Sequence, residues 1–467
     1  MLGNTRSHGF NWVFLGSASA LLALSALFAT GASAQVIPPI CLGLGCDIGG
    51  GGGSLPPVPV PDENPIDAYK AVLGKILFWD EQLSSDNSVA CGTCHLTERG
   101  GADERRGRHP GFDGIFQTPD DVFGSQGVVR RDSNGVPIAD PLFGFDVQVT
   151  GRSAPAFFGG LWDPSTFWDG RAEGPFLDPL TGAVVIPSGG ALEIQSLAPI
   201  LSDVEMAKEG RTWAEVIAKL EVAPPLALAE ELPPDVAAAL ANGATYPDLF
   251  ERAFSNGAID PVNIAFAIAT YERTLVADQA PWDAFMDGAL DAMTPEQITG
   301  WQTFQGTACA SCHAPPIFTS GRFNNVGLRE VFEDVGRQGA TGNFFDRGRF
   351  KVPTLRNVGV RPKFMHTGEI RSVARVVDFY QPATAHFPDN LDPQVPVFIP
   401  PAARPALVDF LENGLTDPRV AAGEFPFDRP TLWMETNVPE PAGTLQLAAG
   451  VAALFAIERA RRRRSHG

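Results

Sequence analysis

The chain has 467 residues, with 54 acidic and 35 basic side chains and a formal net charge of −19. This acidic balance argues against nucleic acid as a partner, because a phosphate backbone attracts basic surfaces. About 370 residues lie between two unusual ends, which is enough for two or three ordinary domains.

The amino-terminal end has the pattern of an export signal over residues 1–34. Arg6 and His8 precede an apolar run over residues 12–28, and Ala32-Ser33-Ala34 before Gln35 has the form of a signal-peptidase site. A membrane-spanning anchor is the weaker alternative, because the run is short and rich in Ala and Ser. We expect an exported protein located in the periplasm or at the cell surface.

A Gly- and Pro-rich segment over residues 35–64 follows the signal and predicts a flexible tether. It contains Cys41 and Cys46, which can form a small disulfide loop in an oxidising compartment. A metal role for this pair is not favoured, because no His lies nearby.

Two C-x-x-C-H pentads occupy residues 91–95 and 309–313. Two thiols at this spacing can form thioethers to the vinyl groups of one porphyrin, and the adjacent imidazole can then bind the iron. A zinc site or a thioredoxin-like motif does not require two complete copies. We therefore predict two covalently bound haems c, attached through Cys91, Cys94, Cys309 and Cys312 and ligated by His95 and His313.

Helices dominate the segments that can be interpreted. Similar apolar leads precede the two pentads, at residues 73–78 and 300–304, and Asp260-Pro261 and Thr294-Pro295 predict helix starts. Residues 100–150 and 174–190 lack periodicity and predict long loops. The expected fold is mostly α, with two cytochrome-c-like haem domains over residues 65–285 and 286–420 whose haems face a common interface.

The carboxy-terminal end, residues 437–467, has three parts. Val438-Pro439-Glu440-Pro441 is followed by an apolar segment at residues 445–457 and an Arg cluster at residues 459–464. This order resembles the PEP-CTERM sorting signal of Gram-negative bacteria, which implies an exosortase-type processing enzyme as a partner. A plain tail anchor is the alternative. Both place the folded part outside the inner membrane, because the positive end stays in the cytoplasm.

Several ordered motifs resemble the bacterial di-haem cytochrome c peroxidase and MauG family over residues 65–420. Besides the pentads, the motifs are Leu73-Gly74-Lys75, Arg152-Ser153-Ala154-Pro155, Phe167-Trp168-Asp169-Gly170-Arg171, Glu205-Met206, Lys351-Val352-Pro353-Thr354-Leu355-Arg356-Asn357 and Met365-His366-Thr367-Gly368. The resemblance implies that the His95 haem has an open face that reacts with hydrogen peroxide, and that the His313 haem relays electrons.

The same resemblance assigns three catalytic residues. It places the Glu205 carboxylate over the open iron, Trp168 between the haems and Gln195 near the peroxide. A carboxylate with a raised pKa can move a proton between the two peroxide oxygens. Without the resemblance, Glu205 would be interpreted as a surface carboxylate and Trp168 as a packing residue.

The sixth ligand of the His313 haem is predicted from spacing. Family peroxidases place a Met fourteen residues after the His of the motif at residues 365–368, whereas the MauG branch has a Tyr there, and His366 plus fourteen is Tyr380. Met365 is the rival ligand. A phenolate favours ferric iron more than a thioether does, so Tyr380 indicates a store of oxidising equivalents.

Three features depart from the family. His109 lies near the position of a blocking distal His but is interpreted as a surface residue, and Thr307 replaces a Trp that serves protein substrates in MauG. Ser153, Arg361 and Lys363 occupy the inter-haem calcium position. Two cations there argue against calcium, and Arg361 is a candidate replacement for the ion.

The sequence thus predicts an exported di-haem c-type oxidoreductase that reduces hydrogen peroxide at the N-terminal haem with electrons passed through the C-terminal haem. The electrons come from a small redox protein or from an oxidisable protein or metabolite substrate. The alternative is a non-catalytic, membrane-tethered electron-transfer cytochrome c.

Overall fold

The computed structural model describes residues 55–436, so the export signal, Cys41, Cys46 and the sorting tail lie outside the described residues. The described residues all belong to one unit of the chain. They form mostly helices, as predicted, with a few very short strands. Within residues 55–436, no helix combines the length and the apolar character needed to cross a membrane.

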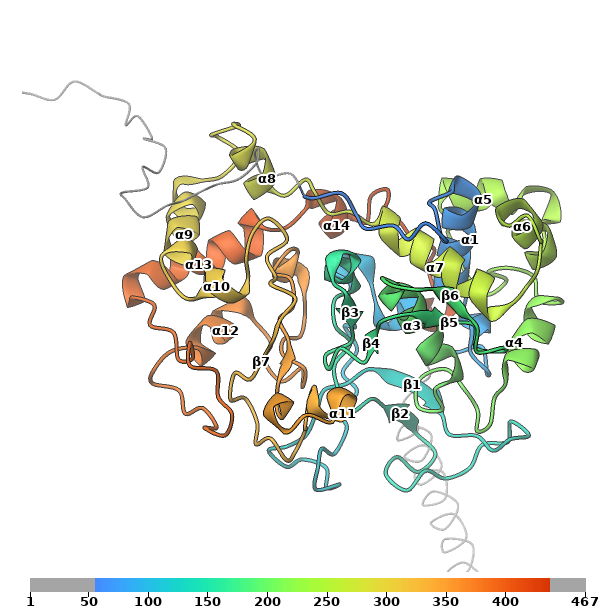
Figure 1. Ribbon diagram of the computed structural model, residues 1–467, viewed down its shortest axis with the longest axis horizontal. Coiled ribbons are helices and arrows are strands. Elements are labelled where there is room, and N and C mark those ends of the chain that lie inside the picture. The colour runs from blue at the N-terminus through green and yellow to red at the C-terminus, as the bar shows by residue number, and fades with distance from the viewer. Residues whose placement is uncertain (1–54, 437–467) are drawn as a thin grey trace, which may run out of the picture. The chain divides into compact units, whose positions relative to one another are not determined.

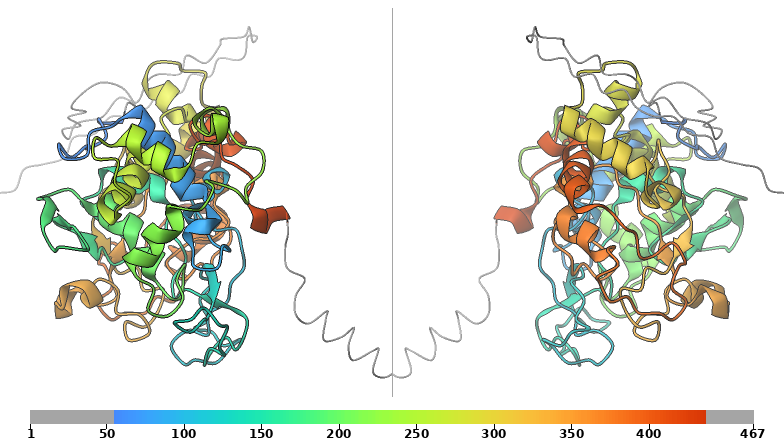
Figure 2. Two further views of the ribbon diagram at one scale, coloured as in Figure 1. Left: turned by 90° about the vertical axis from the view of Figure 1, so that its right-hand side faces the viewer. Right: turned by 90° about the vertical axis from the view of Figure 1, so that its left-hand side faces the viewer.

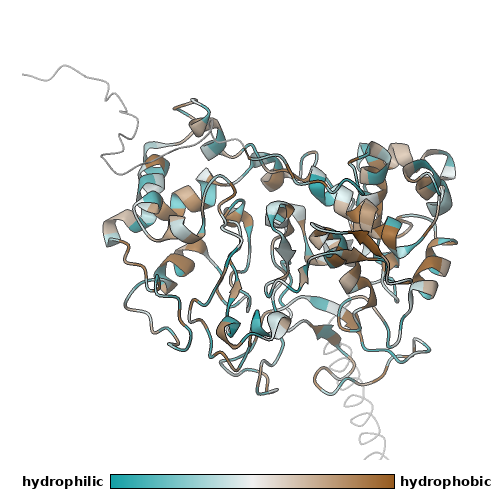
Figure 3. Ribbon diagram, viewed as in Figure 1, coloured by the Kyte–Doolittle hydropathy of each residue, from teal (hydrophilic) through white to brown (hydrophobic). Residues whose placement is uncertain are grey.

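In the segment predicted as the N-terminal domain, residues 65–285 (the N-terminal half), α1 (Ala68–Trp79) crosses α7 (Pro261–Thr274). Helix α7 begins where predicted, because the Asp260 side chain accepts a hydrogen bond from the Asn263 backbone and Pro261 occupies the first turn. Gly74 permits the crossing, since a Cβ there would lie 1.9 Å from the Ala267 carbonyl oxygen. Figure 3 shows hydrophobic residues gathered around α7.

The C-terminal half, residues 286–420, repeats this design with α9 (Pro295–Gln305) and α13 (Arg404–Asp409). Thr294 caps α9 through a capping box, as expected from the Thr-Pro start. A Cβ at Gly300 would lie 2.0 Å from the Ala406 carbonyl oxygen. In each half, one helix of a close crossing precedes the pentad in the chain and its partner helix follows the pentad, and each half has its own hydrophobic core.

The remaining helices are short and surround these crossings (Figure 1). They are α2 (Cys91–Cys94), α3 (Ala191–Leu197), α4 (Trp213–Leu220), α5 (Pro234–Ala239), α6 (Tyr246–Ala253), α8 (Pro281–Met286), α10 (Cys309–Cys312), α11 (Gln338–Thr341), α12 (Val373–Phe379), α14 (Pro418–Ala422) and α15 (Trp433–Thr436).

Four antiparallel strand pairs complete the described fold. They are β1 (Gln126–Val129) with β2 (Val147–Val149), β3 (Ser165–Thr166) with β4 (Ala172–Glu173), β5 (Phe176–Leu177) with β6 (Val184–Ile186), and β7 (Phe323–Asn324) with β8 (Phe350–Lys351). The pairs β1–β2 and β5–β6 lie in segments that the sequence predicted as loops. Such short ladders carry too little alternation of apolar residues to be detected.

The two ends of the described chain pack against the N-terminal half. Asn64, in the segment expected to be a tether, is fully buried and donates hydrogen bonds to Glu193 and the Phe266 carbonyl. At the other end, the Phe427 ring lies 5.4 Å from the Phe158 ring. Figure 2 shows this carboxy-terminal segment beside the N-terminal helices.

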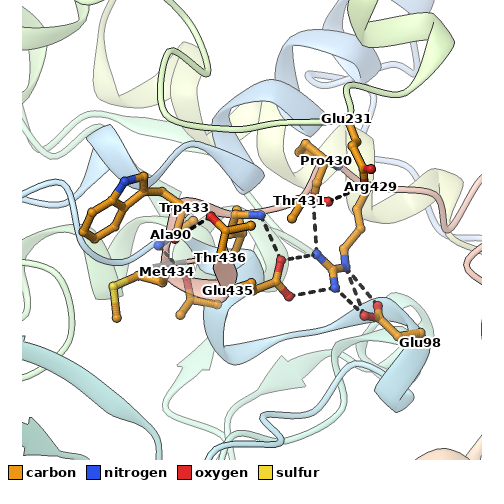
Figure 4. Close-up of polar contacts among 12 residues, drawn as sticks. Ala90, Glu98, Glu231, Arg429, Pro430, Thr431, Trp433, Met434, Glu435 and Thr436 are labelled. Atoms are coloured by element: carbon orange, nitrogen blue, oxygen red, sulfur yellow. Dashed lines mark hydrogen bonds and ion pairs between the residues drawn. The ribbon is translucent and has the colours of Figure 1, made fainter. Parts of the chain in front are cut away.

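Polar contacts fix the last described residues in place (Figure 4). The Arg429 guanidinium pairs with Glu98 and with Glu435, and Thr431 exchanges backbone hydrogen bonds with Glu230. Residues beyond 420 thus return from the C-terminal half to cover the N-terminal half.

Candidate functional site

The first pentad forms α2, and His95 is the residue that ends this helix. The His95 Nδ1 atom lies 3.1 Å from the Gly101 carbonyl oxygen, and the imidazole ring meets the Phe157 ring edge to face at 5.7 Å. Burial lowers the pKa of His95, which keeps the imidazole neutral. A carbonyl partner on Nδ1 leaves Nε2 as the atom that can bind iron.

A cavity of about 440 Å³, the first cavity, opens beside this histidine. Its lining brings together the predicted residues Cys94, His95, Trp168, Gln195 and Glu205. Cys91 does not line the cavity but precedes Cys94 by one helical turn, and burial, with the nearby carboxyl of Glu272, raises the pKa of its thiol. Five predicted side chains from different parts of the chain therefore face one space.

Glu205 lies in a turn closed by a hydrogen bond from its backbone to the Ser202 carbonyl. This backbone packs directly on β1, where a Cβ at Gly127 would lie 2.8 Å from the Glu205 Cα. Burial raises the pKa of the Glu205 carboxyl, whereas a hydrogen bond with Ser202 and the charge of Arg171 act in the opposite direction. The carboxyl that faces the cavity can therefore exchange a proton closer to neutral pH than an exposed one.

The second pentad forms α10, and His313 ends it in the same way. The His313 Nδ1 atom lies 3.0 Å from the Pro353 carbonyl oxygen and 3.3 Å from that of Phe318. Burial lowers the pKa of His313 to about 4, so this imidazole is also neutral with Nε2 available.

A second cavity, of about 200 Å³, is lined by Cys309, Cys312 and His313. Both candidate sixth ligands, Tyr380 and Met365, line it as well. Val373, Val376 and Val377 of helix α12 line this cavity together with Tyr380, the residue that caps the carboxy-terminal end of the helix. Burial raises the pKa of the Tyr380 phenol, and the Cys309 and Cys312 thiols add to the rise, so the phenol lies close to the second pentad.

The two cavities share a wall that contains Trp168, Lys351 and residues 153–156. The Trp168 Nε1 atom donates a hydrogen bond of 2.7 Å to the Ser153 carbonyl, which fixes the indole in this wall. Trp168 thus contacts the space beside each pentad.

Two ring side chains that lie near the pentads in the sequence, His109 and Trp301, do not line the cavities. His109 lines neither cavity, and its ring packs 5.8 Å from the Phe143 ring. Trp301 is buried in the core of the C-terminal half, 5.4 Å from the Trp282 ring.

Sequence reasoning missed Glu272, which lines the first cavity from α7 and is only 3% exposed. Its Oε2 atom is buried without a hydrogen-bond partner among the described residues. Burial raises the pKa of Glu272 to about 8, Arg273 opposes the rise and Glu193 adds to it. The available signal in the sequence was a carboxylate that follows an apolar stretch of the same helix, residues 264–269.

The donor set fits two haems c. Each cavity combines a pentad and its oriented histidine with apolar walls and cationic side chains, Arg152 and Arg171 in the first cavity and Arg361 and Lys363 in the second. The position that the sequence analysis assigned to the inter-haem calcium holds a lysine. Lys363 donates to the Arg105 and Gly124 carbonyls, and no group of three or more acidic, His or Cys side chains within residues 55–436 is arranged to bind a metal ion.

The chain is similar in sequence to known proteins. The family profile described as di-haem cytochrome c peroxidase matches residues 68–291. The cytochrome c peroxidase Ccp of Escherichia coli is 29% identical over 322 residues, which are 68% of this chain and 53% of that protein. The methylamine utilization protein MauG of Methylorubrum extorquens is 28% identical over 371 residues, 77% of this chain and 82% of that protein.

Two solved structures share the fold. A MauG-like protein associated with microbial copper homeostasis has a TM-score of 0.54 at 22% identity, covering 80% of this chain and 96% of that chain. The diheme peroxidase BthA of Burkholderia thailandensis has a TM-score of 0.52 at 18% identity, covering 79% and 91%. The family profile and the curated relatives together support the assignment of this chain to the di-haem cytochrome c peroxidase and MauG family.

Proposed function

We propose that the protein is a peroxidase-type oxidoreductase that reduces hydrogen peroxide in the first cavity, with electrons passed from the second. The observation that carries this proposal is the shared wall, because Trp168 contacts the cavity of Glu205 on one side and that of His313 on the other. Curated relatives named as cytochrome c peroxidases and as MauG support the same reaction class.

The bound haems supply iron centres that exchange electrons. Around the first, His95 holds its Nε2 towards the metal through the hydrogen bond to Gly101. The Glu205 carboxylate accepts a proton from one peroxide oxygen and delivers it to the other, which leaves as water. Two electrons and two further protons complete the reduction of one hydrogen peroxide to two water molecules.

The other residues of the two cavities orient the peroxide, connect the two haems or hold them in place. Gln195 on α3 lines the first cavity and offers an amide to orient the peroxide. Trp168 would connect the two haems electronically, and Tyr380, with Met365 as the rival ligand, would hold the second iron and exclude peroxide from it. Each haem c is attached covalently through its pair of cysteines.

The electron source belongs to the same proposal. A small redox protein donates the electrons in a peroxidase, whereas an oxidisable protein or metabolite supplies them in a MauG-like oxidase. We further propose that the chain is exported to the periplasm or cell surface and held at the inner membrane by its tail until an exosortase-type enzyme acts.

Electron paramagnetic resonance of the oxidised holoprotein tests the proposed function. We expect one high-spin and one low-spin ferric signal, and both should vanish together when peroxide is added. Two low-spin signals that do not respond to peroxide would contradict the proposal and favour an electron carrier. The Trp168→Phe variant is the matched control for coupling, since its two signals should respond separately.

A further inference from the structure

Arg361 differs from Arg152 and Arg356, two other arginines near the cavities, because it lacks an anionic partner. Arg152 pairs with Asp169 and Asp334, and Arg356 pairs with Asp283. Arg361 lines the second cavity, and among residues 55–436 it forms no ion pair. Its Nε atom is buried and makes no hydrogen bond within the described chain.

The hydrogen bonds of Arg361 connect it to the second pentad. Its two terminal nitrogens donate to the Thr354 and Arg356 carbonyls at 2.9 and 2.6 Å. The same segment contributes the Pro353 carbonyl that faces His313 Nδ1. The charge of Arg361 also helps to lower the pKa of His313, although burial is the larger cause, so the guanidinium lies close to the imidazole.

Arg361 also lies where the two halves meet. A Cβ at Gly100, in the turn that follows the first pentad, would lie 3.0 Å from the Arg361 Cγ and 3.3 Å from its Nε. The half-buried Arg361 side chain therefore lies against the turn after His95 and is hydrogen-bonded to the segment that orients His313.

A charge without a counter-ion is costly in such surroundings, because carbonyl dipoles replace only part of its hydration. Burial lowers the pKa of Arg361 to about 10, so the guanidinium remains charged at neutral pH. An anionic group in the second cavity would remove the cost.

We propose that Arg361 is the binding site for a carboxylate of the haem in the second cavity and provides the fixed positive charge between the two halves without a metal ion. The proposal rests on the proposed function only in that it requires a haem at His313. An Arg can serve this purpose because each terminal nitrogen of its planar guanidinium uses one N–H for a carbonyl and keeps a second N–H for an anion.

The test compares Arg361→Gln, Arg361→Lys and the control Arg347→Gln in the holoprotein. Arg347 belongs to the same half but pairs with Asp389 at the surface. Spectroelectrochemical titration without peroxide measures the midpoint potential of each haem. Arg361→Gln should lower the potential of the His313 haem, since a nearby positive charge favours the reduced iron. The potential of the His95 haem should change less. Arg361→Lys should retain part of the wild-type potential of the His313 haem, and Arg347→Gln should leave both potentials unchanged.

Two further measurements keep the proposal open to refutation. Arg361→Gln could also reduce haem incorporation, so covalent haem content is measured for each variant. If incorporation falls in Arg361→Gln, the midpoint potential of the His313 haem in Arg361→Lys tests the proposal instead. Unchanged potentials in both Arg361 variants, or stoichiometric calcium in the purified wild-type protein, would overturn it. A wild-type protein that does not react with peroxide would refute the proposed function. The midpoint potentials, which are measured without peroxide, would still test the role of Arg361.

Discussion

Replacing Glu205 by Gln tests the central chemical role assigned to the first cavity. Gln has nearly the same volume, so the packing of this turn on Gly127 should persist and the haem should still attach. Only the ability to take up and release a proton is lost. A positioned acid–base group contributes roughly 10²–10⁴-fold to a rate, which corresponds to about 3–5 kcal/mol of barrier.

Stopped-flow mixing of the oxidised protein with hydrogen peroxide measures this rate directly. The control is Glu209→Gln, which changes a carboxylate four residues away that pairs with Arg130 at the surface. We expect the Glu205 variant to react with peroxide on the order of 10²-fold more slowly or worse, whereas the control should react like wild type.

The pH dependence provides a second criterion. Burial raises the pKa of Glu205, and the ionised form accepts the peroxide proton, so the wild-type rate should fall as the pH drops through a value above the ordinary 4.5. The Glu205→Gln variant should not show this fall in rate at low pH. A Glu205→Gln protein within about threefold of wild type, with this fall retained, would refute the assigned role.

Three other outcomes follow from the structure. Trp168→Phe should slow electron exchange between the haems while both remain bound, which freeze-quenched spectra after peroxide can detect. Glu272 has a folded-state pKa of about 8 against an ordinary 4.5, so wild-type stability should fall as pH rises between these values; each unit is worth about 1.4 kcal/mol. Glu272→Gln should abolish this fall in thermal unfolding, and an unchanged profile would contradict the assignment. Gly300→Ala should destabilise the fold by roughly 1–3 kcal/mol through overpacking against Ala406, measured by denaturant unfolding against Gly339→Ala, whose added Cβ would make only an ordinary contact.

Local signals predicted the helices well. The starts at Asp260-Pro261 and Thr294-Pro295 depend on capping groups within four residues, so the sequence contains the whole interaction. The ladder β5–β6 was not predictable in this way, because pairs of two or three residues gain their stability from surrounding tertiary contacts.

The site residues differ in how well the sequence predicts them. The pentads are recognisable from the sequence alone, because covalent haem attachment requires their spacing. Glu205, Gln195 and Trp168 were assigned through the family resemblance, and no local pattern shows that they face one cavity. Glu272 was overlooked because a helix face dominated by apolar side chains was interpreted as core packing.

The return of the carboxy-terminal segment has a consequence for producing the halves separately. Phe427 and Leu432 belong to the hydrophobic core of the N-terminal half although they follow the C-terminal half in the chain. A fragment that stops at residue 285 lacks part of its own interior, because this hydrophobic core is completed only after Phe427 and Leu432 have been synthesised. Because the carboxy-terminal segment packs into the N-terminal half, we expect that the N-terminal half does not fold stably without the rest of the chain.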